Sequence, residues 1–377
     1  MILNDICEFI VDCPHTTAPD EGAGYPLIRT PNIGKGRLVL NGVHRVSEKV
    51  YRQRIQRGMP QDNDLIFARE APAGNVAIVK NGEKVCLGQR TVLLRPDKSK
   101  VCPDYLVYYI LAPAQQYKLL GTANGATVAH VNLPVIRNMP VELPPLEVQE
   151  IVAGHLSAYD NLIENNQKQI KLLEEVAQRL YKEWFVDFHF PGYEDTPIFD
   201  GVPEGWERLP VGELIEKIPR TTQIMASEYG KEGPIPIIDQ SREFIAGYTD
   251  NQASLVNVGK PVIVFGDHTR ILKYIQFPFA KGADGTQLIV SNTDRMPQSL
   301  FYCSLVGVDL SNYHYARHFK YLKAEELLVP TQVIAEAFDR FVSPMFSKIQ
   351  RLRDINKAAA NARDRLLPKL MSGEIEV

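Results

Sequence analysis

The sequence lacks the features that mark several classes of protein. Its 377 residues include five cysteines, and no two of them form a CxxC pair. This scatter predicts reduced thiols rather than a disulfide framework or a zinc site. No apolar run reaches the ~18 residues that a membrane span requires. The first residues show no charged-then-apolar secretion signal, so we expect a cytoplasmic protein.

Catalytic motifs are missing as well. The sequence holds no GxxxxGK[ST] phosphate loop and no HExxH zinc motif. Its one Pro-Pro pair, Pro144-Pro145, lies between leucines and so cannot be the motif with which amino-methyltransferases orient a base. The Asp-x-Lys or Glu-x-Lys pair of a common nuclease core does not occur. These absences favour a binding or scaffold protein over an enzyme.

Charge of one sign is also lacking, because the net charge is only −3. A uniformly basic DNA-binding surface is therefore excluded for the whole chain. One stretch departs from this balance: from Arg29 to Arg57 there are eight basic residues and a single acidic one, Glu48. Such a run is either a solvated face or the lining of a phosphate-binding groove.

Two segments have the periodicity of long helices. Apolar residues recur at spacings of mostly three to five from about Glu147 to Phe185 and again from about Thr331 to Leu370. Proline precedes each segment, at Pro144-Pro145 and at Pro330, as is typical of helix starts. Helices of ~39 residues would be ~58 Å long, and two of similar length can pair antiparallel as a coiled coil.

The two helices belong to an internal repeat. Adding 186 to a residue number carries Pro144 to Pro330 and Arg179 to Arg365, with other matches in the same order. The regions before the helices are mixed in character, with short β-rich runs and short helices. Within the first, Asn81-Gly82 predicts a hairpin between the runs at 75–80 and 83–87. We therefore predict an α+β chain that is a tandem repeat of about 186 residues: globular half, long helix, globular half, long helix.

Several motifs resemble those of one known family. The run Leu143-Pro144-Pro145-Leu146-Glu147-x-Gln149-Glu150-Ile151 leads into the first helix, which closes with Leu180-Tyr181-Lys182-Glu183-Trp184-Phe185-Val186-Asp187-Phe188. The chain ends in Leu366-Leu367-Pro368-Lys369-Leu370-Met371-Ser372-Gly373-Glu374-Ile375, and shorter matches include Asp12-Cys13-Pro14-His15 and Phe67-x-Arg69-Glu70. Together these resemble the specificity (S) subunit of type I restriction–modification systems, which serve in phage defence.

The resemblance implies a division of labour. Each globular half would be a target-recognition domain that reads one half of a split double-stranded DNA sequence, and the helices would bind two methyltransferase (M) subunits. S-adenosylmethionine, ATP and Mg would belong to the M subunits and to restriction (R) subunits, with no cofactor in this non-catalytic chain. The predicted boundaries are 1–143 and 196–329 for the recognition domains, 144–195 for the first helix and linker, and 330–377 for the second helix and tail.

Candidate site residues follow from the chemistry of base reading, in which Arg suits guanine and Asn or Gln suits adenine. For each of them the alternative is a surface or structural role. The DNA-binding candidates are Arg29, Lys35, Arg37, Arg69 and Arg90 in the first half, and Arg220, Gln240, Arg242, His268, Arg270 and Lys281 in the second. The apolar residues Trp184, Phe185 and Phe188, left over at the end of the first helix, are predicted to bind a partner.

Two other functions remain open at this stage. A stand-alone DNA-binding regulator with two heads and no methyltransferase partner would have the same repeat. An unrecognised hydrolase would need a clustered catalytic set, which the sequence does not show. Co-purification with a methyltransferase chain would distinguish these possibilities.

Overall fold

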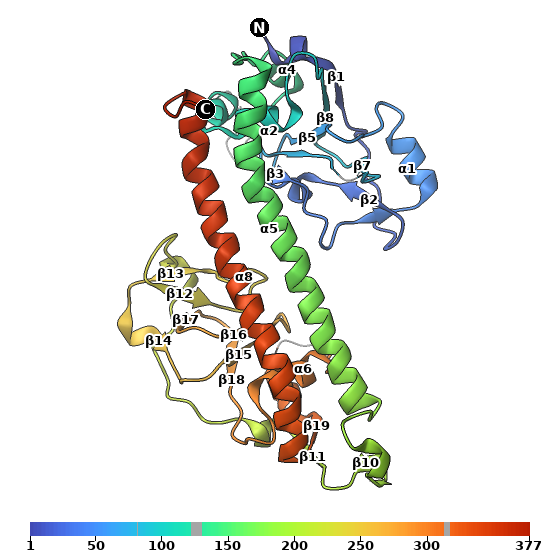
Figure 1. The fold of residues 1–377 in the computed structure, drawn as a ribbon, viewed down its shortest axis with the longest axis vertical. Coiled ribbons are helices and arrows are strands. Elements are labelled where there is room, and N and C mark those ends of the chain that lie inside the picture. Colours follow the sequence, from blue (N-terminus) through green and yellow to red (C-terminus); the bar gives the residue numbers. More distant parts are fainter. Residues whose placement is uncertain (81, 122–129, 313–316) are drawn as a thin grey trace. The chain divides into compact units, whose positions relative to one another are not determined.

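The computed structural model describes residues 1–80, 82–121, 130–312 and 317–377. These residues form two compact units, the first made of Met1–Asn165 with Ile355–Val377 and the second of Asn166–Asp354. Each unit therefore holds one globular head and part of both long helices (Figure 1). The four segments predicted from the sequence divide the chain differently, and that division stays a prediction.

Head 1, the globular part of the first unit, contains a five-stranded sheet of order β1-β8-β5-β6-β3 and a three-stranded sheet of order β4-β2-β7. The strand β5 reads Leu-Ile-Phe-Ala and is buried throughout, as expected for a central strand covered on both faces. The strands are β1 (Cys7–Asp12), β2 (Tyr25–Ile28), β3 (Gly36–Arg37), β4 (Arg45–Val46), β5 (Leu65–Ala68), β6 (Val76–Ile78), β7 (Cys86–Leu87) and β8 (Thr91–Pro96).

Short helices complete head 1. The helix α2 begins at Pro103, whose fixed φ suits the first helical position, and six of its nine residues are buried. It packs into one core with the larger sheet, with Leu156 of the long helix α5 (Leu146–Tyr181) and with Leu367 and Leu370 of the long helix α8 (Gln332–Ser372). The helices are α1 (Glu48–Arg54), α2 (Pro103–Leu111), α3 (Pro113–Gly121) and α4 (Leu133–Arg137), after a 3-10 turn η1 (Leu3–Ile6).

Head 2, the globular part of the second unit, has a three-stranded sheet of order β16-β15-β18 and a four-stranded sheet of order β13-β12-β17-β14. The pairs β10-β9 and β11-β19 form two further, two-stranded sheets. The elements are β9 (Ile198–Phe199), β10 (Val202–Pro203), β11 (Glu207–Pro210), β12 (Ile235–Ile238), β13 (Gly247–Thr249), β14 (Leu255–Val256), β15 (Val262–Gly266), β16 (Leu272–Ile275), β17 (Phe279–Lys281), β18 (Thr286–Ile289), α6 (Gln298–Val306), α7 (Phe319–Ala324) and β19 (Glu326–Val329).

The two heads share the topology of their central strands. In head 2, β15 pairs antiparallel with β16 and β18, as β5 does with β6 and β8 in head 1. Likewise β12 pairs antiparallel with β13 and parallel with β17, as β2 does with β4 and β7. The shared topology confirms the internal repeat predicted from the sequence.

The long helices are α5 (Leu146–Tyr181), which passes into a π turn at Lys182–Val186, and α8 (Gln332–Ser372). Their bounds confirm the two predicted helices within a few residues, and α8 continues through Pro344. The helices run antiparallel within each unit. In the second unit Glu174 pairs with Arg353, and Trp184 packs edge-on against Phe338.

A buried polar triad joins the helices in the first unit. Asp160 of α5, whose side chain is 3% exposed, forms an ion pair with Arg363 of α8. Its other carboxylate oxygen accepts a hydrogen bond of 2.6 Å from Tyr108 of α2. The triad therefore ties both helices to head 1 at one level.

The hairpin predicted at Asn81-Gly82 is wrong. The strand β6 pairs with β5 and β3, whereas β7 pairs with β2 in the other sheet. Asn81 itself lies outside the described residues. The strand pairings follow tertiary packing here, because both β6 and β7 are fully buried and each completes a different sheet.

The buried triad yields a stability prediction. Replacing Arg363 by Leu leaves the Asp160 carboxylate buried without its cation, so the free energy of unfolding should fall by about 3 kcal/mol. A triple variant, Asp160→Leu with Arg363→Leu and Tyr108→Phe, should recover most of this loss. Urea unfolding of the three proteins checks it, and equal stability of Arg363→Leu and wild type would contradict the structural role of the triad.

Candidate nucleic-acid interface

In each head, loops that follow equivalent strands carry the polar residues of the candidate site. The backbone N–H of Arg69, after β5, donates to Arg90 O at 2.9 Å, and the N–H of Asp267, after β15, donates to Gly285 O at 2.8 Å. Similarly Gly88 N–H donates to Ile28 O at 2.8 Å, and Gly282 N–H donates to Ile238 O at 2.9 Å. We call these loops the loop edge: those after β1, β2 and β5 and between β7 and β8 in head 1, and those after β12 and β15 and between β17 and β18 in head 2.

The loop edge has the same frame and different side chains in the two heads. By these backbone bonds, Arg69 of head 1 corresponds to Asp267 of head 2, and Arg90 corresponds to Gly285. Strand pairing extends the match, since Ala68 faces Thr91 as Gly266 faces Thr286. Two heads with one backbone frame and different edge residues can bind chemically different ligands.

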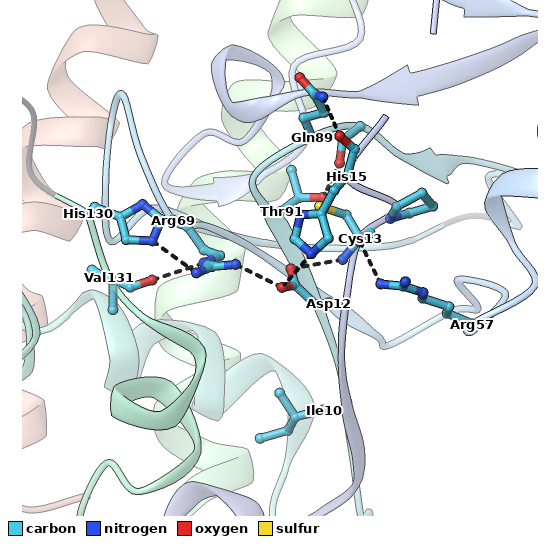
Figure 2. Close-up of polar contacts among 12 residues, drawn as sticks. Ile10, Asp12, Cys13, His15, Arg57, Arg69, Gln89, Thr91, His130 and Val131 are labelled. Atoms are coloured by element: carbon cyan, nitrogen blue, oxygen red, sulfur yellow. Dashed lines mark hydrogen bonds and ion pairs between the residues drawn. The ribbon is translucent and has the colours of Figure 1, made fainter. Parts of the chain in front are cut away.

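Arg69 is the centre of a charged network in head 1 (Figure 2). Its guanidinium binds Asp12 at the end of β1 (2.8 Å), the carbonyl of Val131 (3.0 Å) and Nε2 of His130 (2.9 Å). The side chain is mostly buried. Arg69 therefore holds three segments of head 1 together, and truncating it should disrupt the head rather than remove one base contact.

The partners of His130 determine its tautomer. An arginine can only donate hydrogen bonds, so Nε2 of His130 must accept the bond from Arg69. The proton of the neutral ring is then on Nδ1, which donates to Glu70 Oε1 at 2.5 Å. Burial, followed by the positive charges of Arg69 and Arg90, lowers the pKa of His130 below its usual value. The neutral ring is the form that fits both partners.

The network ends at the surface with Arg90. Its guanidinium pairs with Glu70, whose side chain is 15% exposed, whereas that of Arg90 is 60% exposed. We call the five residues Asp12, Arg69, His130, Glu70 and Arg90 the head 1 network. It brings together two of the predicted DNA-binding residues, Arg69 and Arg90.

The other predicted residues of head 1 lie in different surroundings. Arg29 follows β2, and its buried Nε finds no hydrogen-bond partner among the described residues. Lys35 is exposed between two glycines. Arg37 instead contacts α5, where it donates to Asn161 at 3.0 Å and lies 3.9 Å from Glu164. It helps to hold head 1 on the helix.

Gln240 braces the loop edge of head 2. Its carbonyl oxygen accepts from the backbone N–H of His268 at 3.0 Å, and its amide donates to Asp284 O at 2.8 Å. Both ends of this side chain are thus occupied within the head. The imidazole of His268 is exposed beside Gly285, where an added Cβ would lie 2.6 Å from it.

The remaining predicted residues surround this brace. Arg242 is exposed on the loop after β12. Arg270 has a positive φ of 61° and donates to Leu310 O at 3.0 Å, which anchors part of its guanidinium. Lys281 ends β17, and burial, followed by the charge of exposed Arg220, lowers its pKa.

Sequence reasoning missed the acidic and histidine members of the head 1 network. Asp12 lies in the motif Asp12-Cys13-Pro14-His15 and Glu70 in Phe67-x-Arg69-Glu70, but a motif shows a pattern and not the partners of its side chains. An arginine that reads a base needs a carboxylate or carbonyl to hold it in place. The sequence could therefore have indicated that acidic residues in these motifs are partners of the candidate arginines. In head 2 the missed member is buried Asp267, which accepts from Phe319 N–H at 2.7 Å.

The predicted partner surface requires a correction. Trp184 and Phe185 are buried in the core of the second unit, and Phe188 packs edge-on against Trp206. They were expected to be left over because the sequence does not show that the π turn folds this end of α5 onto the core. The helices instead expose other apolar residues, which are Ile151, Leu162, Leu172 and Val176 on α5 and Val333, Phe341 and Ile355 on α8.

Comparison with known proteins identifies the family. Residues 1–175 match the model of the type I restriction modification DNA specificity domain. The MjaIX specificity subunit of Methanocaldococcus jannaschii is 25% identical, over 94% of this chain and 88% of the relative. The HindI specificity subunit of Haemophilus influenzae is 20% identical, over 83% of this chain and 86% of the relative. Residues 1–175 thus carry the DNA specificity domain, and over most of its length the chain is similar to the specificity subunits of type I restriction–modification systems.

A solved structure agrees in fold. The S subunit from M. genitalium superimposes with a TM-score of 0.57 at 15% identity, covering 98% of this chain and 95% of that one. S subunits are the non-catalytic specificity components, and S-adenosylmethionine and ATP belong to the M and R subunits. This similarity confirms the predicted DNA-recognition function and argues against both the stand-alone regulator and the hydrolase.

Two absences concern only the residues that the structure describes. No helix there is long and apolar enough to cross a membrane. Within the same residues, no group of three or more His, Cys, Asp or Glu is placed to hold a metal ion.

The lowered pKa of His130 predicts a pH dependence. In the unfolded chain His130 titrates near its ordinary value of 6.5, and in the folded chain below it. As the pH falls below 6.5 the unfolded state binds a proton that the folded state does not, so stability falls. The Tm of wild type should therefore drop more between pH 7.5 and 5.5 than the Tm of His130→Asn. His155→Asn, which removes an exposed imidazole from the same unit, is the control, and identical drops in wild type and His130→Asn would refute the prediction.

Proposed function

We propose that the two loop edges read the two halves of a bipartite DNA target separated by a fixed gap. The observation that carries this proposal is that the two loop edges have the same backbone hydrogen bonds but different side chains. Arg69 and Arg90 in head 1 correspond to Asp267 and Gly285 in head 2. Since base reading depends on donors and acceptors at fixed positions, the two half-words should differ.

The charge of the chain limits how tightly it can bind DNA by itself. With a net charge of −3, the chain attracts phosphates weakly as a whole. Positive residues are concentrated locally, at Arg29, Lys35 and Arg90 in head 1 and at Arg220, Arg242 and Arg270 in head 2. Tight binding is therefore expected of the complex with methyltransferase subunits rather than of the isolated chain.

The long helices supply the partner surface in this proposal. At ~100° per residue, Ile151, Leu162 and Val176 lie within about 40° of one another on α5. They and the exposed apolar residues of α8 form stripes that a partner would cover. We assign these stripes to the methyltransferase subunits, with restriction subunits added to the same complex. Because the proposed substrate is cellular DNA, the proposal places the chain in the cytoplasm.

Head 2 gives a direct test of base reading. His268→Ala removes an exposed donor at the loop edge, so one position of one half-word should lose about 1–3 kcal/mol of discrimination. Arg242→Ala should affect the same half-word or its flanking phosphates. Sequencing the sites methylated by the complex measures both effects.

The matched control for these variants is Arg208→Ala. It removes one exposed positive charge from β11, outside the loop edge, and should leave both half-words unchanged. If His268→Ala altered both half-words, or neither, the assignment of one half-word to each head would fail.

The helices should set the gap. We expect that inserting four residues after Lys168 in α5, matched by four after Lys357 in α8, lengthens both by ~6 Å. B-DNA rises ~3.4 Å per base pair, so the gap should grow by one or two base pairs while both half-words stay the same. Methylated-site sequencing shows the gap directly. Full activity on the original gap would mean that the helices do not set it.

A further inference from the structure

The head 1 network has a defined direction from the interior to the surface. Arg69 donates to Asp12 and to His130, His130 donates to Glu70, and Arg90 forms an ion pair with Glu70. Every donor in this chain of bonds meets an acceptor. Resting on the proposed function, we propose that Arg90 reads a guanine in the half-word of head 1, and that Glu70 and His130 are positioning residues that fix its guanidinium.

The geometry of Arg90 suits the edge of a guanine. Arg90 has a positive φ of 63°, and one end of its guanidinium is held by Glu70. The remaining N–H groups form a planar fork of the kind that matches O6 and N7 of guanine. A fork that is already oriented loses little conformational freedom on binding.

The charge of the network supports the same choice. With His130 neutral, the carboxylates of Asp12 and Glu70 balance the guanidinium groups of Arg69 and Arg90. The network therefore offers little net attraction to a phosphate but keeps its directed hydrogen bonds. Head 2 has glycine at the position of Arg90, so this guanine contact should belong to head 1 alone.

The main experiment compares Arg90→Ala, Arg90→Lys and Glu70→Gln in the complex with methyltransferase subunits. Sites methylated by each complex are sequenced, and rates are measured on duplexes that carry each base at every position of both half-words. Arg90→Ala should reduce discrimination for guanine roughly 5- to 150-fold at one position of one half-word. Arg90→Lys should lose much of the same discrimination because an ammonium group has no fork. Glu70→Gln should relax that same position and no other.

A matched pair at His130 tests the positioning role. Asn in place of His130 can put its amide N–H where Nδ1–H was and still donate to Glu70. Gln in its place reaches instead toward Arg69. Discrimination at the guanine position should therefore be better kept in His130→Asn than in His130→Gln. This comparison also decides the role of Glu70 if the Glu70→Gln protein fails to assemble.

The alternative outcomes are distinct. If Arg90→Ala slowed methylation equally at all sequences, reduced the salt dependence and was rescued by Arg90→Lys, Arg90 would contact a phosphate and the proposal would be overturned. Equal discrimination in the two His130 variants would overturn the positioning role. Failure of the proposed function would look different, since head 2 variants such as His268→Ala would then also fail to act on a single half-word.

Discussion

The antiparallel pairing of α5 and α8 is the constraint on which the rest of the structure depends. Each helix contributes to both units, so each head packs against parts of both helices. In the first unit the buried triad of Tyr108, Asp160 and Arg363 fixes this packing at one level. A buried carboxylate is tolerated there only because a cation and a hydroxyl satisfy it. The same requirement makes any other alignment of these three groups unfavourable.

In the corresponding layer of the second unit, aromatic side chains hold the head on the helices. Tyr302 of α6 packs edge-on against Phe346 of α8, with ring centroids 5.4 Å apart, and the ring of Tyr274 lies tilted against both. In the repeat, Phe346 occupies the place in α8 that Asp160 occupies in α5, 186 residues earlier. A polar layer in one unit and an apolar layer in the other distinguish two heads that otherwise share a topology. Each head therefore packs against a part of the helices whose side chains match its own.

The sequence predicted the long-range organisation better than the local details. The apolar stripe of α5 persists over ten turns, so its length and register were readable without knowledge of its partners. The hairpin at Asn81-Gly82 failed because turn chemistry says nothing about which sheet a buried strand completes. For the site, residue type pointed to Arg69 and Arg90, and both lie at the loop edge, but residue type could not separate a buried brace from an exposed donor. That distinction depends on Asp12 and His130, which are tens of residues away in the chain from at least one of their partners.

The division of the chain into two units also determines which core can form first during translation. The second unit, Asn166–Asp354, is continuous in sequence and can complete its core as soon as its last residue has left the ribosome. The first unit cannot, because Leu367 and Leu370 of its core are made about two hundred residues after Leu156, against which they pack in the same core. The head that is translated first is therefore the one whose apolar surface stays uncovered longer, and its final closure waits for the last turns of α8.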